Sequence, residues 1–412
     1  LSILALAIAG LLLAAAPAGA VVAQVPGPDI GYQPLNGQGP SAPSQSDAIT
    51  NLEYHGGPVM PSMKQYAIFW APSGYSFPAG YKTAATQFLK DVAADSPHPT
   101  NVYSVGSQFT DSAGDRAAYK ATYGGSFDDA GAYPTSGCPL YTGLVGAAFT
   151  KCLTNAQLGA KVDSVVSAHG LPRGLTTEYF LFLPDSVGSC FLSDGASCFD
   201  KQFCAYHSFT GTGGETLYAN ESFTPRDPTH CGTGEYPNGT GNGPIDDQVS
   251  SLSHEANESI TDPLLNAWWN NTGGTENGDQ CRNTTNDYGF PLGGTAGTFY
   301  NQVINTHHYF LQQEWSNFSS ACEQRYALTG SASGPSKGKK GKPVTFTATG
   351  VDGDGGHITN AKWKFGDGKT AKGLSVTHTY KHAGTFKPTA SVMNSTKLGV
   401  AANPGKIKIK SN

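Results

Sequence analysis

Two parts of the chain carry opposite net charge, and this division restricts the fold more than any single motif does. Residues 327–412 hold 14 Lys, no Arg, no Glu and three Asp, a net +11; the remainder holds 12 basic and 28 acidic residues, a net −16, and the sum is −5. A length of 412 residues is enough for two domains. We therefore expect two modules, joined at 327–343 by a solvated Gly/Ser/Lys linker without apolar periodicity.

The basic module at 344–412 has the pattern of a small antiparallel β-sandwich. Short runs of alternating apolar and polar residues, such as VTFTATG and GKIKIK, are separated by glycine-rich turns. Within it, WKFGDG (363–368) and THTYKHAGTFKPTASV (377–392) resemble the PKD domain, an immunoglobulin-like all-β module. The resemblance implies that Trp363 and Phe365 pack the core and that residues 366–368 form a tight turn. It also implies an accessory module of a secreted protein rather than a catalyst.

The first residues predict export. Residues 1–20, LSILALAIAGLLLAAAPAGA, are an apolar run that ends in an A-x-A pattern, which predicts a signal peptide truncated at its N-terminus. The run is short, a Pro/Gly/Ser-rich stretch follows it at once, and nothing later is apolar enough for a membrane span. We expect a secreted protein, extracellular or cell-wall associated, with a flexible leader at 21–52.

The eight cysteines fit the same compartment. All of them lie in the acidic part of the chain: Cys138, Cys152, Cys190, Cys198, Cys204, Cys231, Cys281 and Cys322. An even number in an exported chain predicts up to four disulfides, whereas the lack of any C-x-x-C pair argues against a zinc cluster. Pairing of nearest neighbours in sequence is one connectivity, but the sequence leaves the pairing open.

The acidic part at 53–326 mixes strand and helix patterns. KQYAIFW (64–70), TEYFLFLPD (177–185) and the shorter, edge-like FCAYHSF (203–209) read as strands. Helical spacing occurs at 80–96 and at 153–170, where Thr154 is the expected N-cap. These patterns predict an α+β domain.

A further helix is predicted at 246–261 and carries the string H-E-x-x-E. Apolar residues recur at three- and four-residue intervals, and Pro263 ends the run. His254 and Glu258 are i and i+4 on one helix face, so both side chains can bind one ion, with Glu255 beside them. In zinc hydrolases the metal acidifies a water molecule and a neighbouring carboxylate takes its proton. Glu255 has the position for that second task.

Two downstream carboxylates are candidates for the third ligand. Glu276 and Asp279 lie in a Gly-flanked turn roughly twenty residues past Glu258. We prefer Glu276 as the ligand, with Asp279 as a ligand or a supporting residue. The alternative is a solvated turn held by Cys281.

Three of the histidines outside the H-E-x-x-E string are weaker candidates for a functional role. His207, in the edge-like strand, could stabilise an oxyanion or line the cleft, or it could be a hydrogen-bonded structural residue. His307 and His308 are expected in a helix with Leu311 and Trp315. One of them could reach the metal, but a place at the edge of the core is the commoner explanation.

The acidic part also resembles known families. Its order of elements, with a buried strand, an edge-like strand, a Gly-rich loop, the H-E-x-x-E helix and a disulfide-braced tail, resembles zincin-type proteases. SHEANESITDP (253–263), G-x-E-x-G-D-x-C (274–281) and the tail 301–325 are similar to the EXORDIUM or phosphate-induced protein family, over roughly 54–326. Plant members are best known as cell-wall proteins linked to growth. The resemblance implies that His254 and Glu258 are metal ligands and Glu255 is the base.

Together these features predict a secreted metal-dependent hydrolase, a metalloendopeptidase acting on extracellular protein or peptide, with a zincin-like α+β domain and a PKD sandwich. Zn²⁺ is the expected ion, and a carboxylate-rich ligand set would also accept Mn²⁺ or Ca²⁺. The alternative is a non-catalytic cell-wall or adhesion protein with a structural or vestigial metal site. The basic module could bind an anionic cell-wall polysaccharide or only aid solubility. No G-x-S-x-G elbow, P-loop or dinucleotide fingerprint occurs, which argues against serine, nucleotide and redox chemistry. We expect no nucleic-acid partner.

Overall fold

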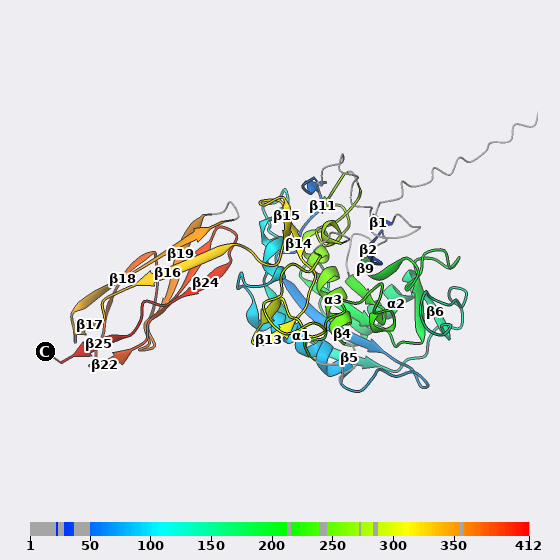
Figure 1. Ribbon diagram of the computed structural model, residues 1–412, viewed down its shortest axis with the longest axis horizontal. Coiled ribbons are helices and arrows are strands. Elements are labelled where there is room, and N and C mark those ends of the chain that lie inside the picture. Colours follow the sequence, from blue (N-terminus) through cyan, green and yellow to red (C-terminus); the bar gives the residue numbers. More distant parts are fainter. Residues whose placement is uncertain are drawn as a thin grey trace, which may run out of the picture.

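A computed structural model describes residues 22–23, 29–36, 50–211, 216–238, 245–271, 273–282, 287–353 and 357–411. The expected signal peptide lies outside these residues. Figure 1 shows a large mixed domain and an elongated C-terminal β-sandwich that extends from one end of it. Within the described ranges, no helix has the length and apolar character needed to cross a membrane.

The large domain is built on a mixed seven-stranded sheet in the order β1-β2-β9-β10-β7-β4-β5. Four neighbouring strands run parallel: β4 (Met63–Trp70), β5 (Ala121–Asp129), β7 (Thr177–Phe182) and β10 (Thr216–Glu221). Three antiparallel strands extend the sheet: β9 (Phe203–Thr210), β2 (Ile30–Pro34) and β1 (Val22–Ala23). The three predicted strands are therefore confirmed.

Strand β2 shows that two predictions are wrong: that β9 is an edge strand, and that the whole leader is flexible. β9 is paired on both sides, with β10 and with β2, so it is not an edge strand. The expectation of a flexible leader over 21–52 is wrong for residues 29–36, where Ile30 and Leu35 are fully buried. A polar, proline-containing segment can form a strand when a neighbouring strand supplies its hydrogen bonds, which composition does not reveal.

Helices cover both faces of the sheet. α1 (Tyr81–Asp95) and α3 (Ile245–Thr261) share one core with alternate residues of β4 such as Phe69. The β4 residues that point to the opposite face of the sheet, such as Ile68, share the second core with α2 (Asn155–Ala168). All three predicted helices are confirmed. Thr154 caps α2 in a capping box with Gln157.

Short elements complete the large domain. The 3₁₀ helices are η1 (Val102–Gln108), η2 (Thr224–Arg226) and η4 (Asp279–Cys281). Four small two-stranded sheets pair β11 (Trp268–Trp269) with β3 (Glu53–Tyr54), β12 (Gln302–Ile304) with β13 (His307–Tyr309), β14 (Glu314–Ser316) with β15 (Ala321–Glu323), and β6 (Lys151–Thr154) with β8 (Val187–Cys190).

The helix expected around His307 and His308 is therefore wrong. Both residues lie in strand β13, after a two-residue turn at Asn305 and Thr306 whose φ angles are 46° and 74°. Positive φ at both central positions is the geometry of tight β-hairpin turns and is incompatible with a continuing α-helix. The apolar spacing of this tail reflects residues buried from successive short strands.

Four disulfides join nearest neighbours in sequence. The pairs are Cys138–Cys152, Cys190–Cys198, Cys204–Cys231 and Cys281–Cys322. The last pair links η4 to β15, and this link fixes the turn that carries the downstream carboxylates.

The C-terminal region is a β-sandwich of three small sheets. Their strands are β16 (Leu328–Ser333), β17 (Lys337–Lys339), β18 (Pro343–Asp352), β19 (Ile358–Lys364), β20 (Thr370–Lys372), β21 (Ser375–Thr379), β22 (Gly384–Phe386), β23 (Thr389–Asn394), β24 (Gly399–Ala402) and β25 (Ile407–Lys410). Trp363 and Phe365 lie in its core, as expected. Gly366 and Gly368 adopt φ of 83° and 82°, which accounts for glycine at both positions of this turn.

The linker expected at 327–343 contributes strands instead. β16 pairs with β18, and β17 pairs with β25, so most of this stretch belongs to the sandwich. Its Gly/Ser/Lys composition is typical of a linker because β16 and β17 bury few side chains. Backbone pairing with β18 and β25 holds these strands in the sandwich.

Candidate metal centre

Helix α3 is buried along its whole length, so its polar face must find partners inside the protein. Val249, Leu252, Ala256 and Ile260 form the apolar face in one core of the large domain. The polar face carries H-E-x-x-E and lies against β9, β10 and the turn after the helix. Burial of so many polar side chains is costly unless they are paired or bind an ion.

The structure brings all six candidate residues into one cluster. His254, Glu255 and Glu258 come from α3, Glu276 and Asp279 from the following turn, and His207 from β9. None of these residues is more than 1% exposed.

His254, Glu258 and Asp279 form one group of potential ligands. His254 Nε2 lies 3.0 Å from Glu258 Oε1 and 3.6 Å from Asp279 Oδ1. The Asp279 backbone N–H donates to Glu258 Oε1 at 3.1 Å, which fixes the turn against the helix. The ligand atoms of this group all lie within 4.8 Å of one another.

His207, Glu255 and Glu258 form a second group of potential ligands. His207 Nδ1 lies 3.3 Å from Glu255 Oε2 and 3.7 Å from Glu258 Oε2. The two oxygens of Glu258 therefore face different imidazoles. Glu276 lies on the far side of His207, with Oε1 3.6 Å from Nε2.

Close packing holds the turn 276–281 in place. A Cβ at Gly278 would lie 2.7 Å from His254 Nδ1, so glycine is needed for this approach. Gln312 Nε2 donates to the Gly278 carbonyl at 2.5 Å, and Arg282 donates to Gln312 at 3.1 Å. The alternative of a solvated turn is excluded, because Glu276 is fully buried.

The pKa values of the cluster reflect burial among like charges. Burial raises the pKa of Glu255 and Glu276 well above the usual range, and it also raises that of Glu258. Burial lowers the pKa of His207 to about 4, despite Glu258, so its imidazole is neutral at physiological pH. Burial opposes the charged form of His254, but Glu258 and Asp279 outweigh it and raise its pKa well above normal.

The donor set fits a divalent cation. Glu258 Oε2 and both carboxylate oxygens of Glu276 have no hydrogen-bond partner among the residues that the structure describes. Imidazole and carboxylate ligands suit Zn²⁺, and a carboxylate-rich set also suits Mn²⁺ or Ca²⁺. Metal binding would release the proton that His254 otherwise holds, so affinity should fall as the pH is lowered.

Four buried carboxylates around the cluster escaped the sequence analysis. Glu178 on β7 accepts a hydrogen bond from Ser259 at 2.6 Å, and Glu221 on β10 accepts one from Gln248 at 2.8 Å. Burial raises the pKa of Glu221 to about 8 and that of Asp262 to about 7. It also raises the pKa of Glu314 well above the usual range. A lone Glu inside the apolar run TEYFLF was the available signal for Glu178.

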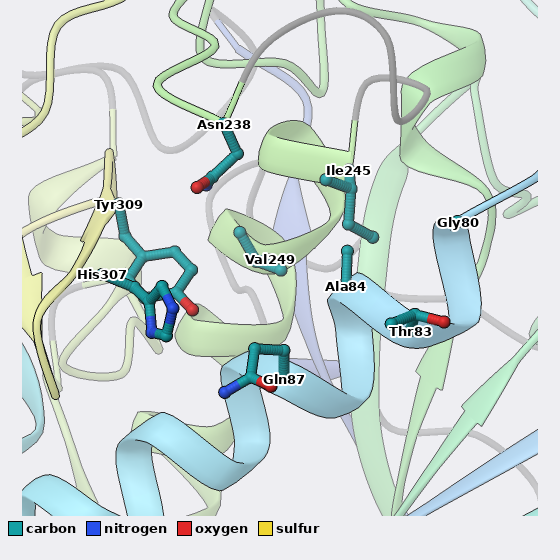
Figure 2. Close-up of a pocket in the computed structure, with 9 residues that line it drawn as sticks. All are labelled: Gly80, Thr83, Ala84, Gln87, Asn238, Ile245, Val249, His307 and Tyr309. Atoms are coloured by element: carbon teal, nitrogen blue, oxygen red, sulfur yellow. The ribbon is translucent and has the colours of Figure 1, made fainter.

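A separate pocket lies at the other end of α3. It has a volume of about 310 Å³, and Figure 2 shows Ile245 and Val249 of α3 facing His307 and Tyr309 across it. None of the six candidate residues lines this pocket. His307 Nδ1 lies 2.8 Å from Asp91, so this histidine has a partner away from the cluster.

Comparisons with known proteins found similarities for both parts of the chain. Residues 329–408 match the model of the PKD domain family. The chain is 25% identical over 280 residues to Protein EXORDIUM-like 5 of Arabidopsis thaliana, covering 63% of this chain and 70% of that protein.

Two solved structures of PKD domains are also similar. The PKD1 domain of Vibrio anguillarum Epp is 15% identical, with 21% of this chain and 96% of that chain covered and a TM-score of 0.19. The PKD1 domain of the Vibrio cholerae metalloprotease PrtV is 24% identical, with 20% of this chain and 98% of that chain covered and a TM-score of 0.18. The chain thus carries a member of the PKD domain family at 329–408 and is similar to an EXORDIUM-like protein, which fits an extracellular protein.

Proposed function

We propose that this chain is a secreted metal-dependent hydrolase, and within that class a metalloendopeptidase, with His254, Glu258 and Asp279 as metal ligands. One observation carries the proposal: His254 Nε2 lies 3.0 and 3.6 Å from the nearest oxygens of the two carboxylates. Ligands about 2.0–2.2 Å from a tetrahedral Zn²⁺ are separated by roughly 3.3–3.6 Å. The 3.6 Å from His254 to Asp279 falls in this range, and the 3.0 Å to Glu258 is slightly shorter. Asp279, and not Glu276, belongs to the group of potential ligands around His254, which favours Asp279 as the third ligand.

A divalent ion held there would supply Lewis acidity towards a carbonyl group and a water molecule. Glu255 follows His254 directly, and its raised pKa suits a general base that takes a proton and later returns it. When His207 carries its proton on Nδ1, 3.3 Å from Glu255, this N–H either orients that carboxylate or, in its place, donates to a developing oxyanion. Glu276, beside His207 Nε2, would orient the imidazole.

The surroundings support a zincin-like arrangement and an extracellular polymer as partner. The antiparallel strand β9 lies beside the H-E-x-x-E helix, and the downstream turn returns to it. On the sandwich, Lys362, Lys364 and Lys372 line a hollow of about 660 Å³ over β19 and β20. Such a basic surface suits an anionic cell-wall polysaccharide and would hold the enzyme near its substrate.

A second function, a non-catalytic cell-wall or adhesion protein with a structural metal, is favoured by one observation. The six side chains of the cluster are at most 1% exposed, whereas a catalytic metal needs an open coordination position.

Metal content and casein digestion, measured on the same purified samples, distinguish the two functions. For a peptidase, wild type carries stoichiometric metal and digests casein, Glu258→Ala loses both, and Glu255→Gln keeps the metal but loses activity. Metal without hydrolysis in the wild type would favour the structural role. The absence of stoichiometric metal would refute both.

A further inference from the structure

Strand β2 lies over the candidate metal centre as an extended peptide. It runs antiparallel to β9, with Gly31 opposite His207 and Gln33 opposite Ala205. The Gln33 backbone N–H donates to Glu255 Oε1 at 3.3 Å. A main-chain group of the N-terminal segment therefore contacts the carboxylate that we assign as the base.

Several further polar contacts of this segment resemble those with which a sheet edge binds a peptide. The Asp29 carbonyl accepts from Ser208 Oγ at 2.9 Å, and the Gln33 side-chain oxygen accepts from Ser251 Oγ at 2.7 Å. Asn36 N–H donates to the His230 carbonyl at 2.7 Å. Addition of a strand to a sheet edge takes affinity from main-chain bonds and selectivity from the sites that receive alternate side chains.

The site opposite His207 accepts only glycine. A Cβ built on Gly31 would lie 2.3 Å from Glu276 Oε2, 2.4 Å from His207 Cε1 and 2.7 Å from Leu265 Cδ2. All of these are far inside van der Waals contact, and the atoms belong to buried residues with little room to move. Space at the metal centre, rather than backbone conformation, therefore requires glycine.

We propose that β9 and the metal centre form a binding groove for an extended polypeptide with glycine opposite His207, and that residues 29–36 occupy this groove intramolecularly. The interpretation as a substrate groove rests on the proposed peptidase function; the binding of a peptide does not. Occupation by β2 also explains why groups proposed for catalysis are buried. Release of the segment would expose β9 and the cluster to another peptide of the same kind.

The test uses the complete secreted chain with a protease cleavage sequence inserted after Asn36. After cleavage, a fluorescent peptide of residues 29–36, DIGYQPLN, is added in excess, and its binding is followed by fluorescence anisotropy. The matched control is DIAYQPLN, and the uncut protein is the second control. A second variant, Gly31→Leu in the intact chain, should displace β2 by steric overlap without any cleavage.

We expect the cleaved protein and the Gly31→Leu variant to bind DIGYQPLN, and the uncut wild type to bind none. DIAYQPLN should bind about tenfold more weakly or worse. If neither altered protein binds while its circular dichroism is unchanged, β2 is a permanent strand and the proposal is wrong. Equal binding of both peptides would refute the glycine requirement. Casein hydrolysis by the uncut wild type should be slower than by the cleaved protein, because β2 competes with the substrate. A cleaved protein that binds DIGYQPLN but carries no metal or digests no casein would refute the proposed function and leave the groove intact.

Discussion

Removal of the divalent ion that we propose for this centre should destabilise the large domain and leave the PKD domain unchanged. Without an ion, Glu258 Oε2 and both oxygens of Glu276 stay buried without a hydrogen-bond partner in the described part of the chain. An ion that binds only the folded state, at a free concentration a thousand times its Kd, adds about 4 kcal/mol. At about 2–4 °C per kcal/mol for a domain of this size class, Tm should fall by about 8–16 °C.

Differential scanning calorimetry of the full chain, with zinc in excess or with a chelator, measures this shift. The transition of the PKD domain is an internal control, because no candidate ligand lies there. Glu258→Gln keeps the shape of the side chain but removes a ligand, so its Tm should be the same with zinc and with chelator. The exposed Glu53→Gln should show the same shift as the wild type. A wild-type Tm that does not respond to zinc, or a Glu258→Gln protein with an undiminished shift, would refute the assignment.

Three further changes test the surroundings of the centre and the PKD domain. Ser259→Ala removes the hydroxyl that donates to buried Glu178, and should cost about 1–3 kcal/mol in urea unfolding, against no change for exposed Ser112→Ala. Burial alone would raise the pKa of Asp367, but the hydrogen bond from His378 lowers it overall. The stability that this pair contributes is therefore present at neutral pH and is lost as the pH falls through that lowered pKa. In acid unfolding of the PKD domain, the stability of Asp367→Asn should depend less on pH than that of the wild type. Replacement of Lys362, Lys364 and Lys372 by Gln should weaken sedimentation with an acidic polysaccharide, and added salt should weaken wild-type binding similarly.

The sequence was informative wherever a local pattern determines local structure. The i, i+4 spacing of His254 and Glu258 places both on one face of a helix whatever surrounds it. Period-2 alternation and the Gly366–Gly368 turn likewise define the sandwich from within a few residues. The helix expected around His307 failed because apolar spacing cannot distinguish a helix from two short strands joined by a turn with positive φ.

The sequence by itself determined the two charge modules, the H-E-x-x-E helix and the candidate residues, because these depend on composition and on spacing along one element. Only the tertiary structure decided which carboxylate meets His254 and where β2 lies. Asp279 meets His254 because a glycine turn, braced by Gln312 and the Cys281–Cys322 disulfide, returns to the helix. β2 covers the centre because it pairs with the side of β9 that faces away from β10, and because Gly31 leaves room for Glu276 and His207. Both depend on contacts between residues far apart in sequence, and no local pattern encodes them.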